Sequence, residues 1–123
     1  MSPEEPPPAG SEAVKRQIAI EIARVHAESY GERAANLKVA FDDELVAVMM
    51  DIEFSPAELT LIGAGREDAV VSTRESYQDA IGDVFVAIVE RATGRRVEGF
   101  ASRAVIVEPT PWSVEVFRLQ PLP

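Results

Sequence analysis

The chain has 123 residues and a net charge of −9, from 21 acidic and 12 basic side chains. This length suits one domain, and the excess of negative charge disfavours binding to nucleic acid or to an anionic membrane surface. The chain has no cysteines, which excludes disulfides and thiolate metal sites and is compatible with the cytoplasmic location that we expect. No apolar run approaches the ~20 residues of a membrane-spanning helix, so we expect no direct membrane insertion.

Residues 1–10 are rich in proline and carry two glutamates. A segment of this kind cannot bury apolar surface, so we predict a disordered tail; a proline-rich docking ligand is the alternative interpretation. The segment lacks the basic and then apolar regions of a signal peptide. We therefore place a single domain at residues 11–120 and a short tail at 121–123.

The first predicted helix covers residues 11–30. Ser11 is a suitable N-cap, and Gly31 follows the last helical residue as a suitable stop. The apolar side chains that recur at helical spacing form one stripe: Val14, Ile18, Ile22 and Val25.

Two strands are expected next, at residues 36–41 and 44–54, with Asp42-Asp43 as the turn between them. Two strand-like runs joined so closely predict a β-hairpin. The first run alternates apolar and polar side chains, whereas the second is almost wholly apolar until Asp51. We therefore predict that the second strand is central, covered on both faces at its start and solvated on one face at its end.

The clearest local signal is the start of a short helix after the second strand. Ser55 and Glu58 have the spacing of a capping box, and Pro56 occupies the first helical position. Phe54 and Leu59 are placed to form a hydrophobic staple across this start. The cap by itself contributes about 1 kcal/mol.

A glycine-rich turn at residues 63–65 ends this short helix, and a long helix is predicted from 66 to 92, followed by Thr93-Gly94 as a stop. We expect its buried stripe to consist of Tyr77, Ile81, Val84, Phe85, Ile88 and Ala92.

Two more strands are predicted at residues 96–108 and 112–119, with a bulge or twist at Gly99 and a turn at 109–111. The element order is then helix, hairpin, short and long helix, hairpin. This order predicts an α+β domain, in which a four-stranded antiparallel sheet has its helices packed on one face.

Catalytic residue sets are not apparent in the sequence. His26 is the single histidine, so neither a hydrolase triad nor a histidine-based zinc site can be built on it. Two carboxylate pairs could act as acid pairs or hold a hard cation: Asp51 with Glu53, and Asp79 with Asp83. In so acidic a chain we favour solvated surface charge for both pairs, and we predict no catalytic residue, no metal, no cofactor and no enzyme activity.

An anion site is a second possibility, at the start of the long helix. The amides around Gly65 could form an anion nest, and Arg66 and Arg74 lie two helical turns apart, a spacing that could clamp a carboxylate or phosphate. Glu67 and Asp68 complement the helix dipole in the same turn, so ordinary ion pairs are the competing interpretation.

The order of these motifs resembles the MpsC-like family, a domain of unknown function named after a proposed sodium-translocating, membrane-potential-generating system. The resemblance spans residues 17–119. It rests on these motifs: Asp42-Asp43, residues 54–61, Gly65-Arg66, Arg74, and residues 93–97. These are mainly caps, turns and stops, so they specify the fold better than an activity.

Two features depart from the family pattern: residues 101–107 lack the aspartate that the family often carries there, and the glycine-rich end of the first helix is reduced to residues 31–33. The resemblance implies an association with sodium or bicarbonate transport in some bacteria. Because the chain itself is not expected to cross a membrane, it would act there as an accessory subunit.

Three functions are consistent with the sequence. The first is a non-enzymatic interaction or accessory module, a homo-oligomer such as a dimer with a possible protein partner, because apolar strand edges need cover. The second is a small-molecule or anion-binding sensor that uses Gly65, Arg66 and Arg74. The third, an enzyme based on the carboxylate pairs, ranks last because no nucleophile or oxyanion donor accompanies them.

Overall fold

The computed structural model describes residues 10–122, so the predicted proline-rich tail and Pro123 lie outside the described residues except for Gly10. The elements are, in chain order, α1 (Glu12–Tyr30), β1 (Ala35–Asp42), β2 (Leu45–Asp51), α2 (Pro56–Gly63), α3 (Glu67–Thr93), β3 (Val97–Val105) and β4 (Trp112–Leu119).

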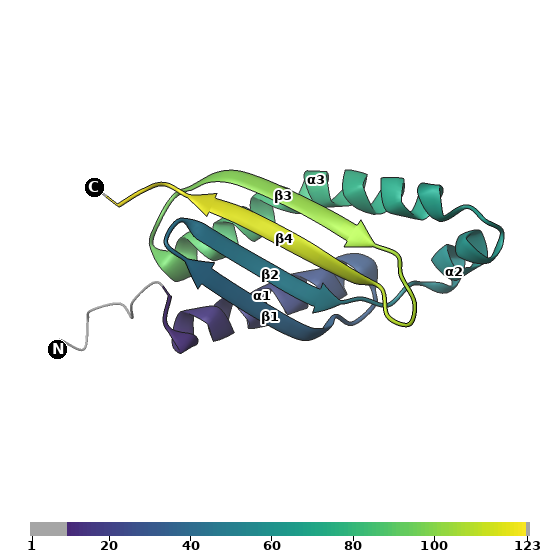
Figure 1. Ribbon diagram of the computed structural model, residues 1–123, viewed down its shortest axis with the longest axis horizontal. Helices are drawn as coiled ribbons and strands as arrows, with labels where there is room; N and C mark the ends of the chain where they lie inside the picture. Colours follow the sequence, from purple (N-terminus) through teal and green to yellow (C-terminus); the bar gives the residue numbers. More distant parts are fainter. Residues whose placement is uncertain (1–9, 123) are drawn as a thin grey trace.

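The strands form one antiparallel sheet in the order β1-β2-β4-β3. Helices α1 and α3 pack behind this sheet, and α2 lies at one end of the molecule (Figure 1). The predicted α+β fold, with two hairpins in one sheet and helices on one face, is confirmed. The register shift between Val97 and Gly99 also confirms the predicted irregularity in β3.

The helix ends are built as their sequences predict. The side chain of Ser11 accepts from the amide of Val14 at 3.2 Å, and Gly31 closes α1 with a φ of 72°. Ser55 and Glu58 form both hydrogen bonds of the capping box at the start of α2. Leu59 is 56% exposed, so the predicted staple buries little of its surface.

Strand β2 is central, as predicted, but it is covered on one face only. Val46, Val48 and Met50 are fully buried, whereas Leu45 is 45% and Met49 40% exposed. The prediction that β2 starts with both faces covered is wrong, because both large helices lie on the same side of the sheet. An unbroken apolar run therefore has an uncovered face here.

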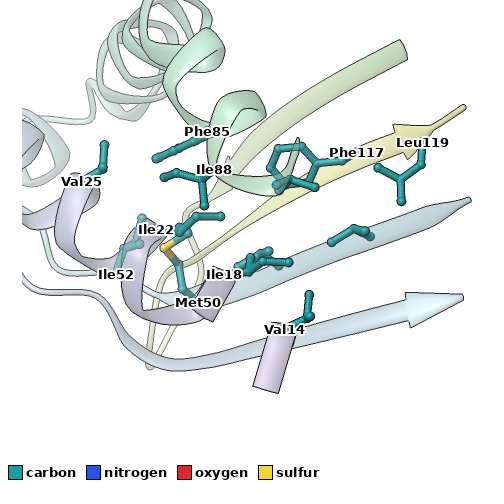
Figure 2. Close-up of a cluster of buried hydrophobic side chains, with 13 residues drawn as sticks. Val14, Ile18, Ile22, Val25, Met50, Ile52, Phe85, Ile88, Phe117 and Leu119 are labelled. Carbon is teal, nitrogen blue, oxygen red and sulfur yellow. The ribbon is translucent and has the colours of Figure 1, made fainter. Parts of the chain in front are cut away.

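The core fills the layer between the helices and the sheet. Figure 2 shows side chains of α1 and α3 meeting those of the central strands. The largest fully buried apolar side chains are Phe85, Phe117, Ile18, Ile22, Met50, Ile88 and Leu119.

The buried face of α3 differs from the predicted stripe. Phe85 and Ile88 are buried as predicted, but Tyr77 is 40% and Val84 46% exposed. The N-terminal half of the helix buries two polar residues instead, Arg74 and Gln78. The buried face of the helix continues here through polar side chains, and the spacing of apolar residues does not reveal such a face. The prediction failed there for this reason.

Gly82 allows α3 to approach strand β3 closely. A Cβ atom at this position would lie 3.0 Å from Cε2 of Phe100, whose ring packs on the core. That distance is shorter than an ordinary van der Waals contact, so a larger side chain must displace the Phe100 ring or the helix.

We expect Gly82→Val to lower the free energy of unfolding by about 2 kcal/mol, the cost of overpacking a filled core. Urea denaturation measures this loss of stability. Ala80→Val is the matched control, because Ala80 is exposed on the same helix and should lose only about 0.5 kcal/mol of helix propensity. Equal losses in the two variants would show that the contact with Phe100 is not limiting.

Candidate functional site

Polar side chains are buried between the helices and one end of the sheet. Burying such groups is costly unless they are paired, so a group of them marks a specialised region of the core. The buried polar residues are His26, Arg74, Gln78, Ser113 and Glu115.

Arg74 is 3% exposed and has a carboxylate partner. Its Nε donates to Oε2 of Glu58 at 2.6 Å, and its Nη2 donates to Oε1 at 2.9 Å and to the carbonyl of Glu53 at 3.1 Å. The guanidinium also lies 4.5 Å from the ring centre of Tyr30 and 5.1 Å from that of Phe54. A bidentate pair with aromatic contacts holds the arginine in one orientation.

Glu58 serves two elements at once. Its Oε1 accepts from the amide of Ser55 at 3.0 Å, which caps α2, while the same carboxylate neutralises Arg74 on α3. Burial by itself would raise the pKa of Glu58, but the hydrogen bonds from Arg74 and Ser55 prevail and hold this pKa below its ordinary value. The carboxylate is therefore ionised in the folded protein.

Glu115 is a second buried carboxylate, fully buried on β4. Its Oε1 accepts from Oγ of Ser102 at 3.0 Å and from Nε2 of Gln78 at 3.3 Å. Its Oε2 has no hydrogen-bond partner among the described residues. Burial raises the pKa of Glu115 to about 7, and the hydrogen bond from Ser102 offsets only part of this effect.

A narrow polar cavity is lined by both hydrogen-bond donors of this carboxylate, Gln78 and Ser102. It is too small to admit a water-sized sphere, and its lining consists of Tyr30, Arg74, Glu75, Gln78, Ser102, Ala104 and Ser113. Three of the lining oxygens are buried without a hydrogen-bond partner among the described residues: the Tyr30 hydroxyl, Oε1 of Gln78 and Oγ of Ser113. The site is therefore rich in oxygen atoms that no neighbouring donor satisfies.

His26 lies on α1 beside this site, with its ring 4.7 Å from that of Tyr30. Burial, and then the positive charge of Arg74, lowers the pKa of His26 to about 4. Burial also raises the pKa of Tyr30 to about 12. Both side chains are uncharged near neutral pH, so neither acts there as a charged ligand or as a base poised for proton transfer.

The structure separates the residues that the sequence suggested for anion binding. Gly65 forms the turn before α3 with a φ of 75°, and Arg66 is exposed at the N-cap of that helix. Arg74 is buried against Glu58 instead. Sequence spacing alone places both arginines on similar sides of α3 but does not tell which of them the core covers.

The carboxylate pairs lie at the surface. Asp51 accepts from Nδ2 of Asn36 at 2.7 Å, whereas Glu53, Asp79 and Asp83 are exposed. Across residues 10–122, no group of three or more His, Cys, Asp or Glu side chains is arranged to hold a metal ion.

Sequence reasoning missed Gln78, Ser102, Ser113 and Glu115. A signal existed in β4, where Ser113 and Glu115 share the strand parity that continues into Phe117 and Leu119. Alternate residues of a strand point to one face, so two apolar residues of that parity indicate that the polar ones also face the core.

Fold and site together define a small α+β domain with ionisable groups buried between its helices and sheet. A family model matches residues 11–118, and the chain belongs to the MpsC family, described as a Na+-translocating membrane potential-generating system. No curated protein and no solved structure matches the chain. The helices between residues 10 and 122 include none with the length and apolar character needed to cross a membrane.

Removing the charge of Glu58 should destabilise the fold strongly, because Arg74 would then be a buried and unpaired cation. We expect Glu58→Gln to lower the free energy of unfolding by about 3 kcal/mol. Ser55→Ala removes the cap but keeps the ion pair, and should cost about 1 kcal/mol. Chemical denaturation of both variants measures this, and a Glu58→Gln loss no larger than that of Ser55→Ala would contradict it.

His26 should make the protein sensitive to acid. Its pKa is lowered from 6.5 to about 4, so between these values the unfolded chain binds a proton that the folded chain does not, and stability falls as the pH falls. The loss integrates to about 3 kcal/mol. His26→Leu lacks this titration, so its stability relative to the original chain should increase between pH 6.5 and 4 in urea unfolding. A constant difference would contradict the prediction.

Proposed function

We propose that this chain is a non-enzymatic interaction module that pairs with a second copy of itself through the open face of its sheet. The open face is the surface of the sheet opposite α1 and α3, toward the viewer in Figure 1. One observation carries this proposal: the face is apolar across its two central strands, although no described element covers it.

The register places the central side chains of the open face in rows. Met49 is paired with Val114, and Ala47 with Val116, across β2 and β4. The apolar side chains of these two strands on the open face are Leu45, Ala47, Met49, Trp112, Val114 and Val116. A contiguous apolar surface of this kind is typical of a protein–protein interface.

Charge favours a second copy as the occupant. The chain has a net charge of −9, so most of its surface would repel another copy. On the open face, however, basic and acidic side chains are almost balanced. Arg118 forms ion pairs with Glu44 and Glu98, and Lys38 and Arg103 are accompanied by Asp42 and Asp51. Two like-charged copies approach at the lowest electrostatic cost through such a face.

The open face is not flat. A hollow of about 500 Å³ lies beside the turn between β1 and β2, with Leu45, Val116 and Arg118 in its lining. A side chain of the second copy can insert there, as interfaces do when an anchor residue fills a pocket.

Family membership supports an accessory role. The family is described as a Na+-translocating membrane potential-generating system, and we propose that this chain serves such a bacterial system as a cytoplasmic accessory protein, with a protein partner of that system as a further contact. An anion sensor is the less favoured alternative, because Arg74 already has Glu58 as its partner.

Sedimentation equilibrium of the purified chain tests the pairing. We expect a dimer, and we expect Val114→Glu to raise its dissociation constant by about 100-fold, because an unpaired carboxylate would be buried at the centre of the interface. Val84→Glu is the matched control, since Val84 is 46% exposed on α3, behind the sheet. This variant should remain as dimeric as the original chain.

A monomer at the highest accessible concentration would overturn the proposed pairing. A dimer that Val84→Glu disrupts and Val114→Glu does not would overturn the choice of face.

A further inference from the structure

The side chains on the open face are sorted by size along the strands. The strand register aligns them in rows that cross the sheet from β1 to β3. One row, which we call the Met49 row, consists of Lys38, Met49, Val114 and Arg103. The adjacent row, the Ala47 row, consists of Ala40, Ala47, Val116 and Ala101. A row of mostly long side chains therefore lies beside a row of mostly alanines.

This sorting makes the open face complementary to itself. A two-fold axis that crosses the strands between the two rows turns each row onto the other, so that long side chains meet alanines. An axis through either row would instead set identical side chains against each other. An axis parallel to the strands, between β2 and β4, would bring Lys38 against Arg103 of the second copy, and these two cations would repel each other.

The same axis places an aromatic side chain over the hollow of the open face. The axis crosses β4 at Glu115, and Trp112 and Arg118 lie at equal distances on either side of this residue. Trp112 of each copy therefore faces Arg118 of the other copy, which lines the hollow with Leu45 and Val116. Trp112 is only partly buried within its own chain. A tryptophan that enters a pocket beside a guanidinium is a typical anchor of an interface.

We propose that two copies pair with their β4 strands antiparallel across the interface, each Met49 row packed on the Ala47 row of the other copy and each Trp112 over the other copy's hollow. This arrangement rests on the pairing through the open face proposed above and adds its symmetry and its anchor. It places the turn between β3 and β4 of one copy over the far end of β4 in the other, with the sheets about 10 Å apart.

Spin labels test the symmetry. The chain has no cysteine, so one introduced cysteine carries a nitroxide at one known position. Thr110 is exposed before β4, and Gln120 is exposed after it. Two Thr110→Cys labels should lie about 30 Å or more apart in pulsed electron paramagnetic resonance, because strands rise about 3.4 Å per residue. A one-to-one mixture of Thr110→Cys and Gln120→Cys chains should add a distance below about 20 Å.

An exchange of side-chain sizes tests the packing of the rows. Ala47→Met sets a long side chain against Met49 of the second copy, and we expect the dissociation constant to rise about 30-fold in sedimentation equilibrium. Adding Met49→Ala to this variant exchanges the two sizes and should restore most of the lost affinity. Ala80→Met is the matched control, because Ala80 is exposed on α3 behind the sheet, and it should not change the dissociation constant.

The outcomes separate this arrangement from the pairing itself. A monomer, or a dimer that Val114→Glu leaves intact, would overturn the pairing through the open face and the arrangement with it. A dimer that Val114→Glu dissociates, but whose two Thr110 labels lie within about 20 Å of each other, would overturn the arrangement alone. A double variant that dimerises as weakly as Ala47→Met would also overturn the arrangement alone.

Discussion

The ion pair between Arg74 and Glu58 attaches α2 to α3, where neither strand pairing nor core packing holds α2 in place. Helix α2 has no buried residue, so apolar packing does little to fix its position. The carboxylate of Glu58 closes the capping box of α2 and at the same time binds the guanidinium that projects from α3. Because Arg74 is almost fully buried, loss of the Glu58 carboxylate would leave a buried cation without its partner.

This pair also determines what the neighbouring core can contain. The guanidinium lies against Tyr30, whose ring packs on His26, and its charge contributes to keeping His26 neutral. Arg74 is paired with Glu58 and makes no hydrogen bond to Glu115, which lies on β4. This end of the core therefore holds a second buried carboxylate without a charged partner among the described residues, whereas Figure 2 shows the buried apolar side chains.

Because α1 and α3 lie on one side of the sheet, the other side of the sheet keeps an apolar surface. Every strand places alternate residues on the two faces of the sheet, and only one face receives helices. The central strands nevertheless carry apolar residues on both faces. The MpsC domain thus combines buried polar side chains at one end of its core with an apolar surface on the open face of its sheet.

The local structure follows from short stretches of the sequence. The cap at Ser55, the stops at Gly31 and Gly94 and the turn at Asp42-Asp43 depend on contacts within a few residues, which side-chain chemistry and glycine's access to positive φ dictate. The element order then limited the fold to a sheet with helices on one side, and the family resemblance followed from the same motifs.

Which polar residues are buried, and which apolar ones are exposed, depends on how the elements pack together. Arg74 and Glu58 are sixteen positions apart, and Gln78 and Glu115 thirty-seven, as their contacts record. Nothing local distinguishes such residues from solvated ones, because the energy that buries them comes from partners on other elements. The uncovered face of β2 could not be predicted for the same reason, because the apolar pattern of a strand does not show whether one or both of its faces are covered.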